Sequence, residues 1–374
     1  MIPSRVRPTE AEIDLAAIAH NVRHVRSVVG DGVAVMAVVK ADGYGHGAVP
    51  VARAALRAGA TWLGVATPEE GAALRAAGIV GPILVLGPVV LEQIEWALYH
   101  RLDVILFDPG AVEAAVAAAR RFQRPLGVHL KIDTGMGRVG LLADRFDASW
   151  IDRLNRPEIL WRGVMSHLAE SDAPSPDPTR EQLARFLDIL EFIRTRRALP
   201  EWLHLANSAA ALRYPGTHFN LVRFGIGLYG AKPFPAANGL RPALTLRSRV
   251  VFVKRVPAGF FVGYGRTYQT PAECWLAAVP IGYADGYRRG LSGQAEVLIR
   301  GRRYPVAGRI SMDQLTVAVP ASHEVAVGDT VTLIGPDGSE AVTAEELAEK
   351  AGTISYEIFT GISQRVPRRY RSAH

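Results

Sequence analysis

The first two-thirds of the chain alternate between short apolar runs and longer amphipathic stretches. Residues typical of turns bound each apolar run, which is the pattern of strands buried on both faces of a parallel sheet. Helices are expected in the intervals, among them Pro68–Ala77, with Thr67 as N-cap and Glu70 completing a capping box, and Thr179–Arg197. The expected strands are Val33–Val39, Trp62–Ala66, Ile83–Leu86, Val104–Phe107, Gly127–Ile132, Gly163–His167, Leu203–Leu205 and Leu221–Phe224.

Eight strands that alternate with helices over about 230 residues predict a (β/α)8 TIM barrel. The alternative is an open doubly wound sheet, which eight regular repeats favour less. No Gly-x-Gly-x-x-Gly turn follows the first strand to support a dinucleotide-binding fold. The sequence therefore favours the barrel.

After about Leu240 the pattern changes, and Gly and Pro turns join short strands. One late helix, Ala344–Lys350, is expected to begin at the cap Thr343, with Glu346 three residues on. The expected strands are Ser248–Val253, Trp275–Pro280, Glu296–Ile299, Leu315–Val319 and Thr330–Ile334. We expect a barrel domain over residues 1–240 and a mostly β domain over residues 241–374, with the boundary in Pro233–Pro242. The first ~12 residues are candidates to join the second domain.

Composition narrows the class of protein. Half of the 374 residues are apolar, which suits a sizeable core, and the single cysteine, Cys274, excludes an intramolecular disulfide. No signal peptide is visible, and no stretch approaches the ~20 apolar residues of a membrane helix. The net charge of +7 comes mostly from dispersed arginines, which favours a solvated surface over a nucleic-acid partner. We expect a cytoplasmic protein that binds neither nucleic acid nor membrane, and a site without metal.

Polar residues stand where the expected strands end, and this is where a TIM barrel places its active site. They are Lys40 at the end of the first strand, Lys131 and Asp133 at the end of the fifth with the loop to Arg138, His167 at the end of the sixth, Asn207 and Ser208 after the seventh, and Arg223 in the eighth.

Lys40 ends the run Val33–Val39, and a glycine-rich loop follows it. An ammonium group held at the end of a buried strand is partly desolvated, which lowers its pKa and makes the amine a better nucleophile and base. Schiff-base lysines use this environment. A lysine that extends out of a core strand is the equally good alternative from this position alone, and the glycine-rich loop favours a ligand site.

The loops after strands seven and eight commonly form the phosphate site of such barrels. Ser208 is expected to cap a helix over Ala209–Leu212, and Gly225-Ile226-Gly227 offers unhindered N–H groups next to it. An ordinary turn explains either loop alone. A phosphate site together with a lysine on the first strand describes a pyridoxal phosphate pocket.

At this point the sequence resembles the alanine racemases, the fold-type III family of pyridoxal-phosphate enzymes, over nearly its whole length. The segments that carry the resemblance are 37–47 (AVVKADGYGHG), 131–140 (KIDTGMGRVG), Asn207-Ser208, 222–230 (VRFGIGLYG), 262–265 (VGYG), 281–286 (IGYADG), 308–314 (GRISMDQ) and 353–357 (TISYE).

The resemblance implies roles for the matching positions. Lys40 would bind pyridoxal 5′-phosphate covalently, with Arg223 at the pyridine nitrogen and His167 near the ring. The residues implied to hold the phosphate are Tyr44, Ser208, Gly225, Ile226 and Tyr356. The remaining implied roles are substrate binding by Arg138 and Met312, with Tyr264 and Met312 reaching in from the other subunit of a homodimer, and an entrance lined by Tyr283, Tyr356 and Arg309.

The implied reaction interconverts L-alanine and D-alanine, and it would supply D-alanine for peptidoglycan. Removing the α-proton from one face and returning one to the other calls for two bases, here Lys40 and Tyr264. A free phenol has a pKa of about 10, so a nearby cation such as Arg138 is needed to favour the phenolate. Arg223, permanently charged, disfavours a proton on the pyridine nitrogen and so weakens the electron sink.

Lys131 and Arg138 would repel each other in one pocket. The resemblance suggests that carbon dioxide carbamylates Lys131, which changes its charge from +1 to −1 and lets it hold Arg138.

Two alternative functions remain. One is another fold-type III enzyme, such as an amino-acid decarboxylase, a D-threonine aldolase or a broad-specificity or serine racemase. The other is a barrel that only binds pyridoxal phosphate. The second, β-rich domain argues against the latter, Tyr264 argues against a decarboxylase, and the missing signal peptide argues against the secreted racemases.

Overall fold

The computed structural model describes residues 7–371, which form two compact units. One unit contains Ile18–Gly43 and Ala48–Arg241. The other contains the described residues up to Ala17, the short segment Tyr44–Gly47, and the chain from Pro242 onward. Gly43 and Tyr44 therefore belong to different units, although they are adjacent in sequence.

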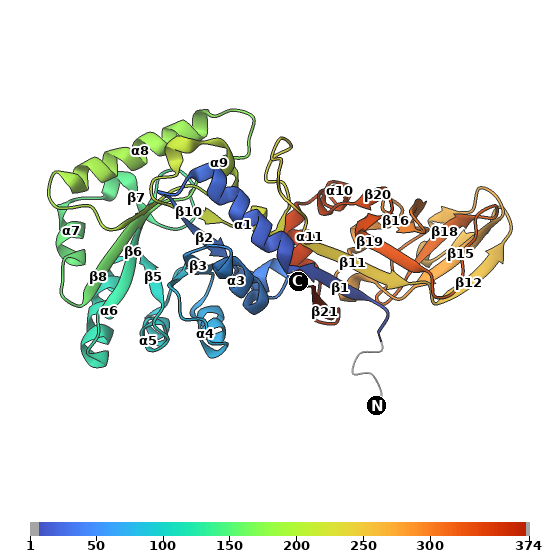
Figure 1. Cartoon of the computed structure of the whole chain (residues 1–374), viewed down its shortest axis with the longest axis horizontal. Coiled ribbons are helices and arrows are strands. Elements are labelled where there is room, and N and C mark those ends of the chain that lie inside the picture. The colour runs from blue at the N-terminus through green and yellow to red at the C-terminus, as the bar shows by residue number, and fades with distance from the viewer. Residues whose placement is uncertain (1–6, 372–374) are drawn as a thin grey trace. The chain divides into compact units, whose positions relative to one another are not determined.

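The first unit is built on a parallel sheet with the strand order β10-β2-β3-β4-β5-β6-β8-β9 (Figure 1). The Arg223 N–H donates to the Ala206 carbonyl at 3.0 Å, and the Leu203 N–H donates to Asn220 Oδ1 at 2.8 Å. These hydrogen bonds join β9 and β10, the two ends of the strand order. The nearly closed eight-strand barrel confirms the predicted fold class. Its strands are β2 Ala34–Val38, β3 Trp62–Val65, β4 Ile83–Val85, β5 Asp103–Leu106, β6 Leu126–Asp133, β8 Ile159–Met165, β9 Trp202–His204 and β10 Leu221–Phe224, and the short β7 Leu141–Leu142 pairs with β6.

Helices alternate with these strands, as βα units require. They are α1 Leu15–Val29, α2 Lys40–Tyr44, α3 Ala48–Arg57, α4 Pro68–Ala76, α5 Leu91–Tyr99, α6 Pro109–Phe122, α7 Ala148–Leu154, α8 Asp177–Arg194 and α9 Ser208–Arg213, with the 3-10 turns η1 Ala143–Arg145, η2 Pro215–Thr217 and η3 Ile226–Tyr229. The helix expected at Thr179–Arg197 is shifted by two to three residues, because Asp177-Pro178 already forms its first turn.

The expected capping box of α4 is only half present. Thr67 accepts a hydrogen bond from the Glu70 N–H at 3.4 Å, as predicted. The Glu70 carboxylate, however, accepts from the N–H groups of Ala66 and Ala41, at 2.7 Å each. The box expectation was therefore wrong for Glu70, because these donors lie outside the helix and no local pattern points to them.

The strands of the barrel pack through a shared apolar core. One buried cluster draws a single residue from each of six strands: Met36, Trp62, Leu84, Ile105, Met165 and Leu221. All eight residues of β6 are buried, as expected of a parallel strand that is covered on both faces. The barrel is therefore a packed body that presents its strand ends rigidly.

The second unit is mostly β, as predicted. Its largest sheet has the order β17-β16-β19-β11-β1-β21, with β20 paired to β19, and a three-stranded sheet has the order β12-β15-β18. The strands are β1 Glu10–Asp14, β11 Leu244–Arg249, β12 Phe252–Val256, β13 Phe261–Val262, β14 Tyr268–Gln269, β15 Cys274–Val279, β16 Glu296–Ile299, β17 Arg302–Pro305, β18 Leu315–Pro320, β19 Thr330–Asp337, β20 Glu340–Val342 and β21 Arg368–Arg371. The helical segments are α10 Ala344–Lys350, α11 Ser355–Gly361, η4 Tyr264–Arg266, η5 Tyr283–Asp285 and η6 Arg289–Leu291.

Several details of this unit differ from expectation, and one helix agrees with it. The predicted strand Ser248–Val253 covers the end of β11 and the start of β12, which belong to different sheets, because the chain turns at Val250. Helix α11 and several strands were not predicted, namely β1, β13, β14, β17, β20 and β21. Of these, β21 lies parallel to β1, a pairing of distant segments that no local pattern shows. Helix α10 begins and ends where predicted, with Thr343 accepting from the Glu346 N–H at 3.0 Å.

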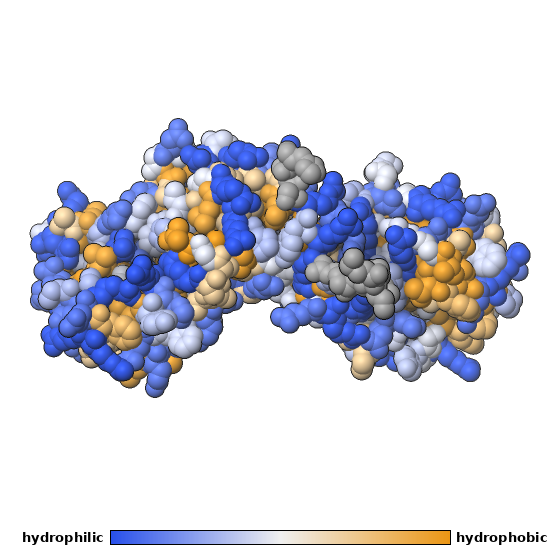
Figure 2. Space-filling model, turned by 60° about the horizontal axis from the view of Figure 1, so that its bottom comes forward, coloured by the Kyte–Doolittle hydropathy of each residue, from blue (hydrophilic) through white to orange (hydrophobic). Residues whose placement is uncertain are grey.

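Hydrophobic residues reach the surface at the end of the second unit that carries β12, β15 and β18 (Figure 2). Around β12 and β13, the side chains of Val251, Phe252 and Phe261 are exposed. None of the described helices combines the length and the apolar content that crossing a membrane requires.

Candidate active site at the strand ends

Lys40 follows β2 and begins a turn with an unusual backbone. Ala41, Asp42 and Gly43 have φ values of 52°, 51° and 62°, and Tyr44 follows with 51°, so four consecutive residues have a left-handed φ. This conformation costs a residue other than glycine roughly 1–2 kcal/mol. The Gly43 N–H donates to Val39 at 2.8 Å, and the Asp42 carboxylate accepts from Ala48 at 2.8 Å. The turn that follows the half-buried lysine is therefore strained and held by specific hydrogen bonds.

Glu70 makes the third hydrogen bond that holds this turn. Its two oxygens accept from the N–H of Ala41 and from the N–H of Ala66, the residue after β3. Burial lowers the pKa of Lys40 below its ordinary value, Arg138 adds to this, and the charge of Glu70 opposes it. The expectation of a lysine with a lowered pKa at a strand end is met, and Glu70, which the sequence analysis assigned only to its helix, is part of its surroundings.

Lys131 lies in strand β6, and Arg138 lies in the turn after that strand. Lys131 is buried, and burial lowers its pKa to about 7, with Arg223 and Arg138 adding to the effect and Asp133 opposing it. Within residues 7–371, its ammonium group makes no hydrogen bond or salt bridge. A buried cationic group among other cations is costly, so the lysine is easily converted to its neutral amine.

Asp133 organises the turn that carries Arg138. Its Oδ1 accepts from the N–H groups of Gly135, Met136 and Gly137 at 2.9, 2.8 and 3.2 Å, and its Oδ2 accepts from the Arg138 N–H at 3.2 Å. Burial alone raises the pKa of Asp133, but these four donors lower it below the ordinary value overall. The carboxylate therefore acts on Arg138 through the backbone.

Arg223 is buried in β10 and is held by backbone carbonyls at the ends of two strands, β8 and β9. Its Nη1 donates to the His204 carbonyl at 3.0 Å, and its Nη2 donates to Ser166 and Leu205 carbonyls at 2.7 and 3.0 Å. Its Nη2 also lies 3.0 Å from His167 Nδ1. Burial lowers the pKa of Arg223 to about 9, still above neutrality, so the guanidinium remains charged.

His167 lies among the cationic groups of this unit. Burial lowers its pKa well below the ordinary value, and the charges of Arg223, Lys131, Arg138 and Lys40 lower it further. The ring is therefore neutral, and because a guanidinium only donates, Nδ1 accepts and the proton is on Nε2.

Ser208 differs from its predicted role. Asn207 is the N-cap of α9, since its side chain accepts from the Ala210 N–H at 3.1 Å, and Ser208 is the first helical residue. The Ser208 Oγ instead accepts from the N–H groups of Gly225 at 2.9 Å and Gly227 at 3.3 Å. The two predicted loops are thus joined, and the hydroxyl hydrogen of Ser208 is left to donate to an anion such as a phosphate.

Tyr44 and Tyr356, both expected to hold the phosphate, lie together in the second unit. Their ring centroids are 5.9 Å apart, with the rings tilted at 44°. Burial raises the pKa of Tyr44, and the neighbouring Tyr356 adds to this, so its hydroxyl is protonated near neutrality and can donate.

Tyr264, Tyr283, Arg309 and Met312 meet on one surface of the second unit. The N–H groups of Tyr283 and Ala284 donate to the carbonyls of Ser311 and Met312 at 3.1 and 3.0 Å. A Cβ added at Gly265 would lie 2.9 Å from Arg309 Nη1. Tyr264, Met312 and Tyr283 are 71%, 52% and 42% exposed, so three loops present these side chains outward.

Two buried histidines were missed by the sequence analysis. His204 touches Arg223, and His129 touches His204. A signal was present for His129, because it lies two residues before Lys131 in a strand and therefore faces the same side. His204 offers no such signal.

Comparisons with known proteins agree with this geometry. The family model described as the alanine racemase N-terminal domain matches residues 13–233, and the model of the alanine racemase C-terminal domain matches residues 243–370. An alanine racemase of Symbiobacterium thermophilum is 48% identical over 370 residues, which cover 98% of this chain and 97% of the relative.

Solved structures agree as well. The crystal structure of alanine racemase from D-cycloserine-producing Streptomyces lavendulae has a TM-score of 0.94 at 42% identity and covers 99% of both chains. That of the Bacillus anthracis alanine racemase with bound L-Ala-P has a TM-score of 0.92 at 40% identity, with 98% of this chain and 96% of the other covered. Since the family models and the relatives extend over both units, the chain belongs to the alanine racemase family.

Proposed function

We propose that this protein is a pyridoxal-phosphate-dependent alanine racemase, an isomerase that interconverts L-alanine and D-alanine. The observation that carries the proposal is Lys40, a half-buried lysine with a lowered pKa at the end of a barrel strand, on a strained turn tied by hydrogen bonds. Relatives that match this protein over nearly its whole length bear the name alanine racemase.

The residues present fit pyridoxal 5′-phosphate. Lys40 would bind it covalently, Arg223 and His167 would face its ring, and Ser208, Gly225, Ile226, Tyr44 and Tyr356 would hold its phosphate. The Ser208 hydroxyl supports this, since its oxygen already accepts two N–H groups and its hydrogen can donate. When bound, the cofactor supplies an electron sink that makes the α-proton of an attached amino acid acidic.

Two residues would move the proton. Lys40 Nζ would take or return it on one face of the α-carbon, and the Tyr264 hydroxyl would do the same on the other, so that each serves in turn as acid and as base. Burial keeps a fraction of the Lys40 amine neutral and able to accept a proton. Arg138 would bind the substrate carboxylate, on a turn that Asp133 organises.

Arg223 would restrain side reactions. Its guanidinium cannot accept a proton and disfavours a second positive charge on the ring nitrogen. Charged and bound to three backbone carbonyls, it cannot rotate away without leaving buried donors unsatisfied. A less electron-deficient ring favours rapid return of the proton over transfer of the amino group.

We further propose a homodimer whose second copy supplies Tyr264 and Met312 to the site, with Tyr283, Tyr356 and Arg309 lining its entrance. Exposure of Tyr264, Met312 and Tyr283 on neighbouring loops supports an interface there, since aromatic residues, methionine and arginine are enriched in interfaces. Carbamylated Lys131 completes the proposal, because its pKa of about 7 leaves a neutral amine to attack carbon dioxide.

Supply of D-alanine for peptidoglycan and a cytoplasmic location belong to the same proposal; the latter rests on the single cysteine, Cys274. Activity is tested by incubating the protein with L-alanine and pyridoxal phosphate and following the loss of optical activity. Borohydride should trap the cofactor on Lys40, and Lys40→Ala should neither trap it nor racemise alanine. A wild-type protein that racemises serine as fast as alanine would point to a broad-specificity racemase.

A further inference from the structure

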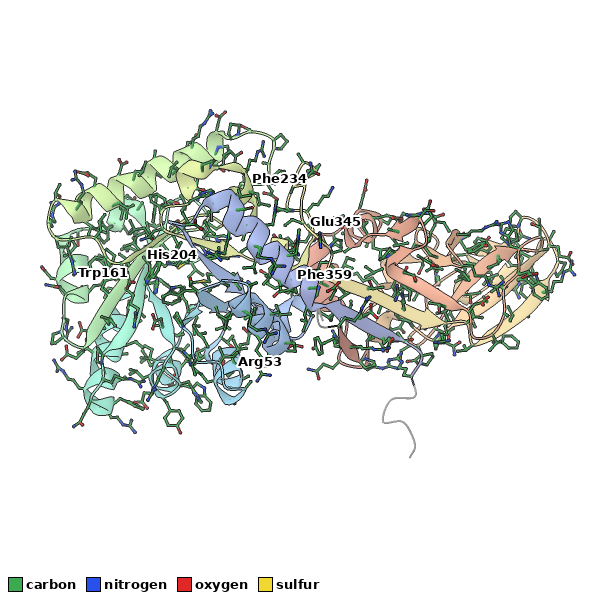
Figure 3. The ribbon with its side chains drawn as sticks, viewed as in Figure 1. Arg53, Trp161, His204, Phe234, Glu345 and Phe359 are labelled. Carbon is green, nitrogen blue, oxygen red and sulfur yellow. The ribbon has the colours of Figure 1, made fainter. Side chains whose placement is uncertain are left out.

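Three side chains connect Arg223 with the opposite end of the barrel strands. Arg223 Nη1 lies 3.3 Å from His204 Nδ1, and His204 Nε2 lies 2.9 Å from His129 Nδ1. His129 Nε2 lies 3.7 Å from Asp103 Oδ2, and Asp103 is the first residue of β5. His204, labelled in Figure 3, lies among the barrel strands.

The barrel has space for this chain of groups because two of its strands carry glycine where the side chains pass. A Cβ at Gly163 would lie 2.4 Å from His129 Nδ1, and a Cβ at Gly127 would lie 2.1 Å from Asp103 Oδ1. Both contacts are far too short for any larger residue. Both histidine side chains are fully buried, and Trp62 packs edge-on against His129 with centroids 5.3 Å apart.

The charge of Arg223 determines where each proton is. A guanidinium has donors only, so His204 Nδ1 accepts and its proton is on Nε2. That N–H donates to His129 Nδ1, which leaves the His129 proton on Nε2, facing Asp103. His204 is neutral, because burial lowers its pKa well below the ordinary value and His129 and Arg223 lower it further.

Asp103 gives this chain its electrostatic direction. Its Oδ2 is 3.7 Å from His129 Nε2 and 3.1 Å from Arg162 Nε, and within residues 7–371 none of these three buried atoms has a hydrogen-bond partner. A carboxylate opposite an imidazole N–H draws its hydrogen outward and makes the other ring nitrogen a better acceptor. The carboxylate acts on His129 through its charge across 3.7 Å, and the two hydrogen bonds of the chain, Arg223–His204 and His204–His129, polarise each other in series.

We propose that Asp103, His129 and His204 are positioning residues, a polar relay that fixes the orientation of Arg223 and the strength of its hydrogen bond from the far end of the barrel. The inference rests on the proposed function, in which Arg223 faces the cofactor ring. Three backbone carbonyls and His167 also accept from Arg223, and His204 is the acceptor that a distant side chain can strengthen or weaken through the hydrogen bond to His129.

The experiment is ¹⁵N NMR of the holoenzyme with labelled histidine and a ¹⁵N-labelled cofactor ring, in wild type and in four variants. His129→Leu removes the acceptor for His204, and His129→Asn keeps an oxygen in the place of Nδ1. Asp103→Asn removes the charge. His218→Asn changes another buried histidine, which is bonded to the Ala211 carbonyl outside the relay, and is the matched control.

The expected wild-type spectrum shows His204 and His129 neutral, both with the proton on Nε2. His129→Leu should shift the His204 signals and that of the ring nitrogen and lower kcat by up to about tenfold, the factor of one net hydrogen bond, with little change in KM. His129→Asn should restore most of the wild-type signals of His204 and the ring nitrogen and most of the wild-type kcat. Asp103→Asn should shift the His129 signals, and His218→Asn should shift none of these.

A His204 proton on Nδ1 in wild type would overturn the relay, as would Asp103→Asn spectra identical to wild type. Should His129→Leu fail to fold, the wild-type tautomers and the Asp103→Asn and His129→Asn spectra decide the question. The tautomers are measured without turnover. An inactive protein with the expected spectrum would therefore count against the proposed function and leave the relay intact.

Discussion

The carboxylate of Glu70 accepts a hydrogen bond of 2.7 Å from the backbone N–H of Ala41, the residue directly after Lys40. Its second oxygen accepts from Ala66 at 2.7 Å. One side chain therefore ties the left-handed turn after Lys40 to the end of the neighbouring strand, and also places a negative charge near the lysine.

Replacing Glu70 with alanine should destabilise the fold and disturb the lysine. Two backbone N–H groups lose their acceptor, and we expect the free energy of unfolding in urea to fall by about 1–3 kcal/mol. Loss of the negative charge should also lower the pKa of Lys40, which is measured by the pH dependence of cofactor attachment. Glu69→Ala, at an exposed neighbour in the same helix, is the control, and equal stability of the two variants would contradict the assigned tie.

Tyr264→Phe should bind the cofactor as wild type does and slow racemisation unequally. The variant keeps the ring and loses only the hydroxyl that would move the proton on one face. Deprotonation of one enantiomer should therefore slow by about a hundredfold or more, within the usual contribution of a general base, and that of the other should slow much less. Solvent deuterium incorporation from each enantiomer measures this, and equal slowing from both would exclude the two-face assignment.

Lys131 should take up one carbon dioxide. Only the neutral amine reacts, so the extent of carbamylation at fixed dissolved carbon dioxide should rise as the pH rises through about 7, the lowered pKa of this buried lysine. The measurement is a ¹³C carbamate signal with ¹³C-bicarbonate, absent in Lys131→Ala. Lys350→Ala, at a lysine paired with Glu346, should retain the signal. An unmodified Lys131 in the intact protein at pH 8 would remove carbamylation from the proposal.

Asp133 should make stability depend on acid. Its folded-state pKa is lowered, so its contribution is fully present above the unfolded value of about 3.9 and is lost as the pH falls through the lower folded value. Asp133→Asn should reduce stability at pH 6 and flatten the loss of stability between pH 5 and 2, as followed by urea unfolding. The exposed Asp188→Asn on α8 should behave like wild type, and an unchanged slope in Asp133→Asn would refute the assignment.

Ser208→Ala should weaken cofactor binding. The variant removes the hydroxyl that accepts from Gly225 and Gly227 and that would donate to the phosphate. Hydrogen bonds to charged groups contribute about 1.5–3 kcal/mol, so the Kd for pyridoxal phosphate should rise about ten- to a hundredfold in a fluorescence titration. The exposed Ser149→Ala is the control. A Kd like that of wild type would place the phosphate elsewhere.

Particular residues show how far sequence reasoning reached. The strand before Lys40 was predicted at Val33–Val39 and is found at Ala34–Val38, because an apolar run between turns is a local signal. Ser208 was predicted to cap the helix that follows it, but the cap is Asn207, to which the sequence analysis gave no role. Either side chain can cap a helix, and only the position of Gly225 draws the Ser208 hydroxyl away from that role.

The contacts of Glu70 and His204 could not be predicted from the sequence. The pattern around Glu70 satisfies a capping box, and the competing donor, Ala41, is 29 residues away in sequence. The relay from Asp103 to Arg223 depends on the register of β5, β6, β9 and β10. A change of one residue in that register would turn each side chain to the other face.

The order of apolar and polar positions alone determined that this chain forms a barrel followed by a β-rich unit, and it showed which residues end the strands, because burial imposes its period locally. The tertiary structure alone decided the left-handed turn after Lys40, the second role of Glu70 and the hydrogen bonds of Arg223. These features depend on which donors and acceptors come into contact across strands. Packing and strand register determine those contacts, and residues far apart in the sequence set both.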